Sequence, residues 1–530
     1  MPMTGGSIEL SKETKSIPVS LVSKDVGSYL HWSADSKSLH WMVGREYHSR
    51  DLKDAFAFVP GAPKELPKPG SDKGIDVGLT ASLDAPSDVF AFTGARLITM
   101  NDAGSKQEVI EDGVLVVDGD SIRAVGAKGS VAIPANARVI DASGKTIMPG
   151  YVDVHAHVNH FTSGVVPQQN WAYYTNLAFG VTTTHDPSAT TETVFSQAEL
   201  VKAGEMVGPR IYSTGTILYG ADGDFKAVVN SLDDARAHLR RMKANGAFSV
   251  KSYNQPRRDQ RQQIDQAARE LGMLVVEEGG STFNHNMTMM IDGVTSIEHN
   301  IPVAPLYADV INLWKETDVR NTPTLVVSYG GLSGEYWWYA RDNVWEDKKL
   351  NRFFPRETLD ARAIRRETAP DWDYYHIEVA KAAKKLRDAG IRINTGGHGQ
   401  LQGLSLNWEI WMLTQGGFSN FEALRAATID GADTIGLSKQ IGSLSPGKRA
   451  DFVVLNSNPL DNIRATIDTR YVAVNGRVFD VDADMAEVGG KGRKAPEFYW
   501  QRHHDGHTFG IEYGPTAPCH CPKSGTLHMH

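Results

Sequence analysis

The chain has 530 residues, more than one ordinary domain needs, and its 41% hydrophobic and 22% charged residues are typical of a globular protein. A formal net charge of −8 and the lack of a basic stripe argue against a nucleic-acid partner. No stretch is long and apolar enough to span a membrane, and residues 1–10 lack the features of a signal peptide. We therefore expect a soluble protein with no membrane partner, cytoplasmic, or periplasmic if it derives from a longer exported parent.

Residues 1–60 are predicted to form a β-rich extension. Aromatic strand patterns flank the turn signal Asp35-Ser36 within residues 28–41. This layout resembles one blade of a Tol-type β-propeller, although one blade cannot close a ring. The segment is therefore either an extension packed on the next domain or the remnant of a longer propeller-containing parent. Residues 61–87 are predicted to be a linker, because their first part is rich in Pro and Gly.

Two β-rich segments, residues 88–148 and 441–485, bracket the middle of the chain. Both contain short apolar runs, such as residues 89–98 and 471–479, with Gly and Asp at the turns. We expect the two segments to form one small β-sandwich domain built from both ends.

Residues 149–440 alternate between strand and helix patterns. The eight predicted strands span residues 151–157, 181–186, 210–214, 248–253, 273–278, 296–300, 322–328 and 391–395. Eight strand–helix units suit a (β/α)8 TIM-type barrel, whose active site lies at the carboxyl ends of the strands. A doubly wound α/β sheet is the alternative, but it would place a Gly-rich turn where this chain has His155 and His157.

An insertion rich in aromatic residues, 329–375, follows the seventh predicted strand. Long loops in compact domains are usually functional or disordered, and the aromatic content argues against disorder. The insertion is either a lid or substrate wall, or packing over the barrel rim. As a wall it would offer Trp337, Tyr339 and Arg356 to the substrate, with Arg356 meeting a carboxylate.

The tail, residues 486–530, contains several histidines and the only two cysteines, Cys519 and Cys521. The spacing matches no closed zinc module, so we expect weak metal binding at most.

His155 and His157 close the first predicted strand and are the strongest candidate ligands. Side chains two residues apart on a strand point to the same face, so two imidazoles would emerge side by side. Such a pair suits a divalent metal, although two histidines in a surface loop would give the same pattern.

Further polar residues end other predicted strands. Lys251 lies in the fourth strand, Glu278 ends the fifth, His299 ends the sixth and His398 follows the eighth. Together with the first pair they form a set typical of metal-ligand chemistry. Each has a simpler interpretation: Lys251 can pair with a glutamate, Glu278 can cap the next turn, and His398 can be a loop histidine.

Three motifs in the chain resemble those of the amidohydrolase superfamily. They are residues 149–157 at the first strand, 426–432 in the last helix and 441–451 where the chain rejoins the sheet domain. The resemblance covers about residues 88–480, and the most similar subgroup is the one associated with Tol-type β-propellers.

The resemblance implies a barrel with one or two divalent metals, commonly zinc. It assigns His155, His157, Lys251 and His299 to ligand positions, with the lysine carbamylated and bridging the metals. Two positions depart from the family pattern, since Glu278 stands where the family has a histidine, and the family's strand-eight aspartate falls at or beside His398. The site is therefore expected to hold either two metals with exchanged ligand types or one metal, with Glu278 and His398 as ligands and catalytic residues.

We predict a metal-dependent hydrolase that cleaves the amide C–N bond of a small molecule or short peptide, such as a dipeptide or an N-acyl amino acid. Metal-activated hydroxide would attack the carbonyl carbon, and His398 would pass a proton to the leaving amine. We also expect a homo-oligomer. One alternative is a deaminase of the same superfamily. The fifth strand has no His-Ala-Glu run to supply the acid–base glutamate of a deaminase, which counts against it. The other alternative is a non-catalytic metal-binding module.

Overall fold

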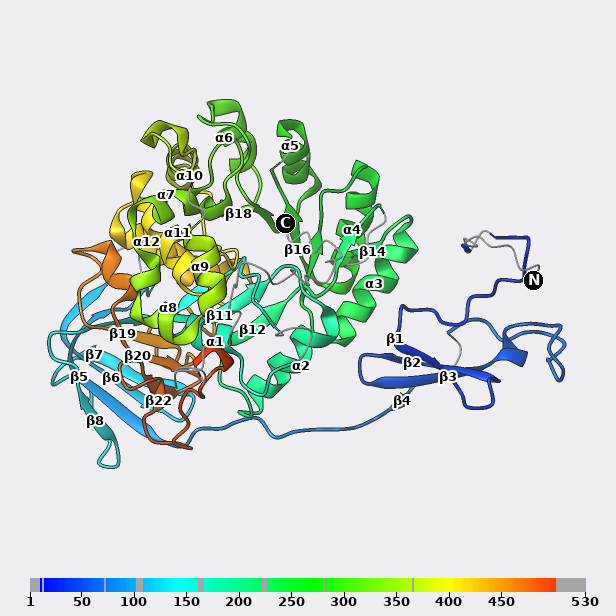
Figure 1. Ribbon diagram of the computed structural model, residues 1–530, viewed down its shortest axis with the longest axis horizontal. Helices are drawn as coiled ribbons and strands as arrows, with labels where there is room; N and C mark the ends of the chain where they lie inside the picture. The colour runs from blue at the N-terminus through cyan, green and yellow to red at the C-terminus, as the bar shows by residue number, and fades with distance from the viewer. Residues whose placement is uncertain are drawn as a thin grey trace, which may run out of the picture.

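The computed structural model in Figure 1 describes most of the chain. The described residues are 10–11, 14–70, 73–101, 108–160, 166–221, 226–280, 282–364 and 367–501. Cys519 and Cys521, together with most of the predicted tail, lie outside the described residues. No helix in the described part of the chain has the length and apolar character needed to cross a bilayer.

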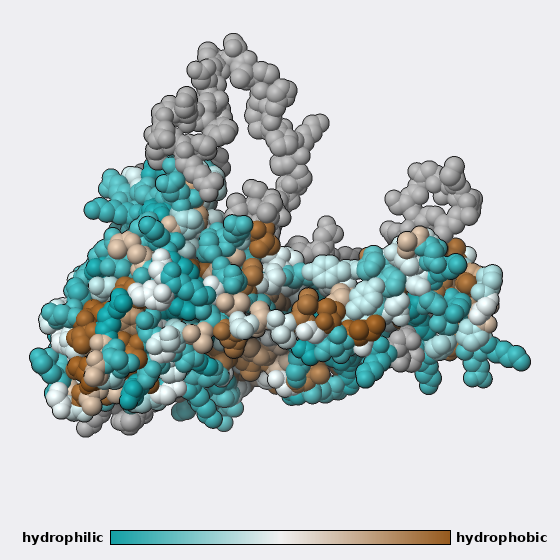
Figure 2. Space-filling model, turned by 90° about the horizontal axis from the view of Figure 1, so that it is seen from below, coloured by the Kyte–Doolittle hydropathy of each residue, from teal (hydrophilic) through white to brown (hydrophobic). Residues whose placement is uncertain are grey.

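A small antiparallel sheet lies at the N-terminal end of the chain. Its strands follow one another in sequence order: β1 (Ser28–Trp32), β2 (Ser38–Val43), β3 (Glu46–Asp51) and β4 (Ile75–Asp76). Strand β4 falls within the segment predicted to be a linker, so the sheet extends beyond residue 60. Figures 1 and 2 both show this sheet projecting to one side of the larger body. Asp25 and Ser28 tie it to the body through Arg240 and Glu192.

A nine-stranded sheet combines both β-rich segments of the chain. The first segment supplies β5 (Val89–Ile98), β6 (Val109–Asp118), β7 (Ser121–Ala127), β8 (Arg138–Asp141) and β9 (Thr146–Pro149), and the second supplies β19 (Phe452–Leu455), β20 (Thr469–Val474), β21 (Arg477–Asp480) and β22 (Ala486–Glu487). Strands β9 and β19 join the two segments, with Pro149 opposite Phe452. Alternate residues of a strand point to the same face, and on one face of this sheet Phe92, Leu115 and Phe452 share one buried core.

The middle of the chain forms parallel sheets. One contains β10 (Tyr151–Asp153), β11 (Val181–Asp186) and β12 (Arg210–Ser213), and the other contains, in spatial order, β14 (Lys226–Val228), β13 (Ile217–Tyr219), β15 (Ser249–Ser252), β16 (Leu274–Glu278), β17 (Ser296–Glu298) and β18 (Arg320–Thr322). Every residue of β11 is buried, as is typical of a parallel sheet covered on both faces. The eighth predicted strand supplies only a bridge, in which Ile393 pairs with Asn321. Beyond it, the Thr395 carbonyl accepts a hydrogen bond of 3.1 Å from the Val154 N–H.

Helices lie outside these parallel strands (Figure 1). They are α1 (Trp171–Ala178), α2 (Thr191–Lys202), α3 (Leu232–Ala244), α4 (Arg258–Leu271), α5 (Phe283–Asp292), α6 (Ala308–Lys315), α10 (His376–Asp388), α11 (Leu404–Gln415), α12 (Asn420–Ala426) and α13 (Ile429–Thr434). Helix α4 illustrates why they form: Ile264, Ala267 and Ala268 recur at helical spacing and are buried. It ends at Gly272, whose φ of +64° is accessible at low cost only without a side chain.

The predicted seventh strand is wrong in position. Strand β18 ends at Thr322, and residues Leu325–Val327 form a 3-10 helix. Pro323 follows Thr322 directly, and because proline has no N–H it cannot continue the ladder. The insertion that follows is helical, with α7 (Gly334–Arg341), α8 (Lys348–Phe353) and α9 (Arg356–Ile364).

Candidate metal centre

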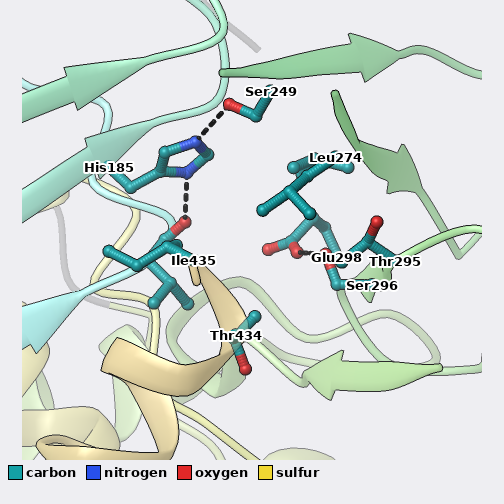
Figure 3. A pocket seen from close by; sticks show the side chains of 10 residues that line it. His185, Ser249, Leu274, Thr295, Ser296, Glu298, Thr434 and Ile435 are labelled. Atoms are coloured by element: carbon teal, nitrogen blue, oxygen red, sulfur yellow. Dashed lines mark hydrogen bonds between the residues drawn. The ribbon is translucent and has the colours of Figure 1, made fainter. Parts of the chain in front are cut away.

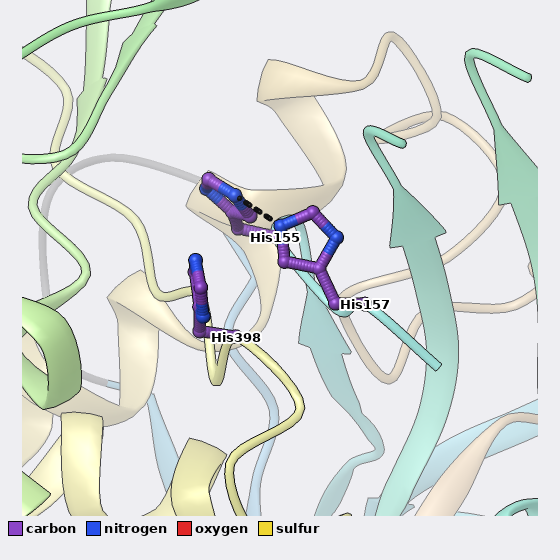
Figure 4. A group of neighbouring side chains, drawn as sticks. All are labelled: His155, His157 and His398. Carbon is purple, nitrogen blue, oxygen red and sulfur yellow. Dashed lines mark hydrogen bonds between the residues drawn. The ribbon is translucent and has the colours of Figure 1, made fainter. Parts of the chain in front are cut away.

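His155 and His157 converge at the end of β10. Their Nε2 atoms lie 3.0 Å apart, and Figure 4 shows the two rings meeting at these atoms. The strand itself ends at Asp153, so strand alternation does not explain the pairing as predicted. Instead the Asp153 carboxylate accepts hydrogen bonds from the N–H groups of His155 (3.1 Å) and Gly397 (3.0 Å), which fixes the turn that carries both rings.

A second set of ligand atoms includes His155 again. The ligand atoms of His155, Glu278 and His299 all lie within 4.8 Å of one another, as do those of His155, His157 and His398. Glu278 ends β16 and His299 directly follows β17, so adjacent parallel strands bring them together. His299 Nε2 lies 3.2 Å from a Glu278 carboxylate oxygen. His155 is therefore common to both sets.

Lys251 joins this cluster through an ion pair with Glu278. It lies on β15, next to β16, and is only 1% exposed. Burial alone would raise the pKa of Glu278, but the Lys251 ammonium and the neighbouring His299 hold it well below its usual value. Glu278 is therefore ionised inside the protein, as a carboxylate ligand must be.

His398 approaches the cluster from the loop after the eighth predicted strand. Its backbone N–H donates to the His155 backbone carbonyl at 2.7 Å. Its ring centre lies 4.6 Å from that of His157 and 5.3 Å from that of His299. A Cβ at Gly396 would lie 2.4 Å from the His155 Cβ, so this approach requires a glycine there. Burial, followed by the nearby His157, keeps the pKa of His398 well below its usual value.

Three of these histidines have an unusual backbone conformation. The φ angles are +25° for His157, +68° for His299 and +54° for His398. Residues with a side chain seldom adopt positive φ, and such strain concentrates at functional sites. The strained turns let the chain aim these rings at one point immediately after a strand or loop.

Two carboxylates orient the ligand rings from behind, and the sequence argument did not assign them this role. Glu298 Oε2 lies 2.9 Å from His155 Nδ1, and Asp186 Oδ1 lies 3.5 Å from His157 Nδ1. Asp186 also contacts His160 and accepts from the Val158 N–H at 2.9 Å. The signal for both was a carboxylate in a run that reads as a buried strand, where an unpaired charge is costly.

The donor set fits a divalent metal. Two nitrogens bound to one zinc at about 2.1 Å in a tetrahedron lie about 3.4 Å apart, close to the separation of the two Nε2 atoms. The Nδ1 atoms of His299 and His398 are buried without a hydrogen-bond partner among the described residues. Imidazole nitrogens and a carboxylate oxygen are ligands that zinc and similar metals accept.

Residues 146–479, more than half of the chain, match the amidohydrolase family. The chain belongs to this family. Its members are metal-dependent hydrolases that act on C–N bonds, so the prediction of such an enzyme is confirmed.

This amidohydrolase also resembles individual known proteins. It is 23% identical over 431 residues to a guanine deaminase of Escherichia coli (strain K12), covering 74% of this chain and 89% of that protein. Its structure resembles a putative prolidase from Bifidobacterium longum, with a TM-score of 0.58, 22% identity and coverage of 78% and 97% of the two chains. It also resembles a Xaa-Pro dipeptidase with methionine bound in its active site, with a TM-score of 0.57, 20% identity and coverage of 74% and 100%. At these identities, the structural similarity speaks for a shared fold alone.

Glu298 also lines a small pocket in this amidohydrolase (Figure 3). His185 lines it, with Nδ1 3.2 Å from the Val154 carbonyl and Nε2 2.8 Å from Ser249 Oγ. Because a carbonyl only accepts, Nδ1 is the ring nitrogen that donates to Val154. Burial lowers the pKa of His185 to about 4. Both ring nitrogens of His185 therefore have partners in the lining of this pocket, Val154 and Ser249, and His185 is not one of the candidate metal ligands.

The three predicted substrate contacts of the insertion have partners elsewhere. Tyr339 is 2% exposed and packs edge-on against Trp408, with 5.3 Å between the ring centres. Trp337 carries the Arg341 guanidinium at 4.2 Å from its ring centre. Arg356 forms an ion pair of 2.9 Å with Asp360. These contacts favour packing of the insertion over contact with a substrate.

Proposed function

We propose that this amidohydrolase cleaves the amide bond of a small carboxylate-bearing substrate, such as a dipeptide or an N-acyl amino acid. The observation that carries the proposal is the buried cluster of His155, Glu278 and His299, in which Lys251 keeps the carboxylate ionised. The names of the similar solved structures, a putative prolidase and a Xaa-Pro dipeptidase, support an amide substrate over other C–N bonds.

The architecture proposed for this function is a closed (β/α)8 barrel with the cluster at the carboxyl ends of its strands. The Asn321–Ile393 bridge and the Val154–Thr395 hydrogen bond support closure, since they link the last strand region to both β18 and the end of β10. A β-sandwich beside the barrel is supported by β5, which pairs with β6 along one edge and with both β8 and β9 along the other.

We assign His157 and His398 to one metal position and Glu278 and His299 to the other, for one or two zinc ions, and the one nitrogen of His155 that does not face Glu298 would bind one of them. A divalent metal held there would lower the pKa of a water molecule and would polarise the substrate carbonyl. In its ammonium form, Lys251 pairs with the Glu278 carboxylate and balances its charge. If Lys251 loses its proton and its amine adds carbon dioxide, releasing a second proton, the resulting carbamate would be an anionic ligand and would no longer pair with Glu278.

The histidine at position 398 is the group proposed to move the proton. Its Nδ1 has no partner among the described residues, and its lowered pKa leaves the ring neutral at the start of the reaction. In the arrangement in which His398 does not bind a metal, its neutral ring can accept a proton at its one unprotonated nitrogen and deliver it to the nitrogen of the leaving amine. The hydrogen bond from the His398 backbone N–H to the His155 backbone carbonyl holds this residue beside the ligand set.

Deamination is the second candidate, because the guanine deaminase similarity extends over 431 residues. A deaminase releases ammonia from a ring carbon, whereas an amidohydrolase of the proposed type releases a carboxylic acid and an amine. The two products are distinguished directly by measuring ammonia and primary amines.

The test is a substrate panel applied to the full chain loaded with zinc or manganese. The panel contains dipeptides, N-acyl amino acids, guanine and deoxyadenosine. We expect amine release from at least one amide and its loss in His155→Ala. The control is His285→Ala, since His285 contacts Arg261 on the outer side of the strands. Ammonia release from a purine without amide hydrolysis would establish the deaminase instead.

A further inference from the structure

A third histidine, His160, follows His155 and His157 on the chain and belongs to neither ligand set that the described residues form. It is 5% exposed, and both of its ring nitrogens have partners. Nδ1 lies 2.8 Å from the Tyr173 hydroxyl, and Nε2 lies 3.0 Å from Asp186 Oδ2. Because both nitrogens are already engaged, His160 is not free to bind a metal.

Asp186 connects His160 to the metal-ligand cluster. Its Oδ2 also accepts from the Val158 backbone N–H at 2.9 Å, and its Oδ1 accepts from the Ser188 backbone N–H at 2.9 Å. The same Oδ1 lies 3.5 Å from His157 Nδ1. Because backbone N–H groups only donate, they favour the ionised carboxylate, which only accepts. The nitrogens of His157 and His160 that face Asp186 must then be the ones that carry protons.

Tyr173 decides which nitrogen of a neutral His160 ring carries the proton. A neutral imidazole has one donor and one acceptor nitrogen. When Nε2 donates to Asp186, Nδ1 accepts from the Tyr173 hydroxyl, and all three groups are satisfied. Tyr173 itself is fully buried on α1. The start of this helix is fixed to the loop of His160, because Asn170 Nδ2 donates to the Asn159 carbonyl at 2.7 Å.

His157 needs such support more than His155 does. The side chain of His157 is 27% exposed and its φ is +25°, whereas the side chain of His155 is fully buried. A ligand ring that its neighbours enclose only in part depends on the hydrogen bond behind it for its orientation. Whatever fixes the Asp186 carboxylate therefore also fixes the direction in which His157 presents Nε2.

We propose that His160 is a positioning residue of the candidate metal centre. Tyr173 keeps the proton of the neutral ring on Nε2, and that N–H holds the Asp186 carboxylate against His157. The inference rests on the metal positions assigned above and is independent of the substrate. A carboxylate behind a ligand histidine orients the ring and raises its basicity as a ligand. Loss of His160, or of the Tyr173 hydroxyl, should therefore weaken metal binding without removing a ligand.

The test measures the zinc affinity of the full chain by competition with a chromogenic chelator, with no substrate present. His160→Leu keeps a side chain of similar size without its hydrogen bonds and should lower the affinity about 10-fold. His160→Gln should recover most of this loss, because its amide nitrogen can take the place of Nε2. Tyr173→Phe should lower the affinity about 3- to 10-fold, the value of one neutral hydrogen bond.

A double-mutant cycle separates the choice of proton position from packing. An amide nitrogen donates whatever faces the rest of the side chain, so Tyr173→Phe should have little effect in the His160→Gln background. Tyr174→Phe is the matched control and should keep the wild-type affinity. Tyr174 is the next residue on α1 and is also buried, but its hydroxyl lies 3.4 Å from Gln169 Oε1.

The outcomes separate this inference from the proposed function. The expected pattern of affinities supports the inference even if the chain hydrolyses no amide, a result that would count against the proposed function alone. Three results would overturn it even if amides are hydrolysed: wild-type affinity in His160→Leu, no recovery in His160→Gln, or equal losses from Tyr173→Phe in both backgrounds. Zinc bound by other parts of the chain is common to all variants and cancels in each comparison.

Discussion

The two faces of strand β16 each bury a glutamate, and the pKa values of the two carboxyl groups are shifted in opposite directions. Glu278 points toward the metal-ligand cluster, where Lys251 and His299 hold its pKa well below the usual value. Glu277, its neighbour, is fully buried on the other face, and burial together with the nearby Asp265 holds its pKa well above the usual value. The surroundings therefore favour ionisation of Glu278 and oppose ionisation of Glu277.

The difference lies in what surrounds each carboxyl group. Burial opposes ionisation on both faces, and only the inner face supplies enough positive charge to reverse it. A buried anion with a cation and three imidazoles around it is what a metal site requires. The outer face is packed against α4, and there burial opposes ionisation of the Glu277 carboxyl group.

The largest expected effect separates the two glutamates. Glu278→Gln leaves the Lys251 ammonium buried without its anion, which should cost about 3–5 kcal/mol of unfolding free energy and lower kcat/KM at least about 100-fold. Glu277→Gln puts a neutral amide where the surroundings oppose ionisation of the carboxyl group, and it should cost at most about 2 kcal/mol. Urea unfolding in the presence of a chelator, and amide hydrolysis with metal restored, measure both. Equal losses for the two variants would contradict the comparison.

The buried carboxyl groups on the outer face should make the stability of the fold depend on pH. Burial raises the pKa of Asp265 on α4 to about 7, although Arg261 opposes the shift. Between pH 4 and 7 the folded protein keeps a proton that the unfolded chain has released, so stability falls as pH rises, by up to about 4 kcal/mol. Asp265→Asn should remove this part of the fall in unfolding midpoints measured from pH 4 to 7. An unchanged pH profile would show that Asp265 is ionised, whereas Asp233→Asn, at an exposed position, should leave the profile as it is.

The carboxylates behind the ligand rings provide a smaller effect on the inner face. Asp186→Asn keeps the shape of the side chain but weakens its hold on His157, which should lower zinc affinity about 10- to 100-fold. Competition with a chromogenic chelator measures the affinity, and Asp309→Asn on the exposed face of α6 is the control. Wild-type affinity in Asp186→Asn would mean that Asp186 only orders the loop of Val158 and Ser188.

The smallest expected effect concerns an ion pair on the surface. Asp360→Ala removes the partner of Arg356, and since both side chains are more than a third exposed it should cost no more than about 1 kcal/mol. Thermal or urea unfolding measures the loss. A cost comparable to that of Glu278→Gln would show that burial does not decide the value of an ion pair in this protein.

Much of the candidate site could be predicted from the sequence because parallel strands end at one rim. His155, Glu278 and His299 follow or end their strands, and the structure brings them within 4.8 Å. The supporting role of Glu298 could not be predicted in the same way. Strand alternation would send Glu298 and His299 to opposite faces, but the φ of +68° at His299 turns both toward His155.

The fold was predictable where the pattern was regular and less so where it depended on packing. The buried run of β11 and the apolar spacing of α4 match the predicted elements. The aromatic insertion was ambiguous, since aromatic side chains suit a substrate wall and a core equally. The structure places Trp338 and Tyr339 against Trp408, contacts between segments about 70 residues apart that no local pattern encodes.

The central claim, that the strand-end cluster holds a metal, is tested most directly by metal content. Zinc bound per chain after loading and dialysis should be compared between the wild type and His155→Ala by elemental mass spectrometry. Because His155 belongs to both ligand sets, the difference should equal one or two zinc ions per chain, whatever other parts of the chain bind. Equal zinc content in the two proteins would contradict the account.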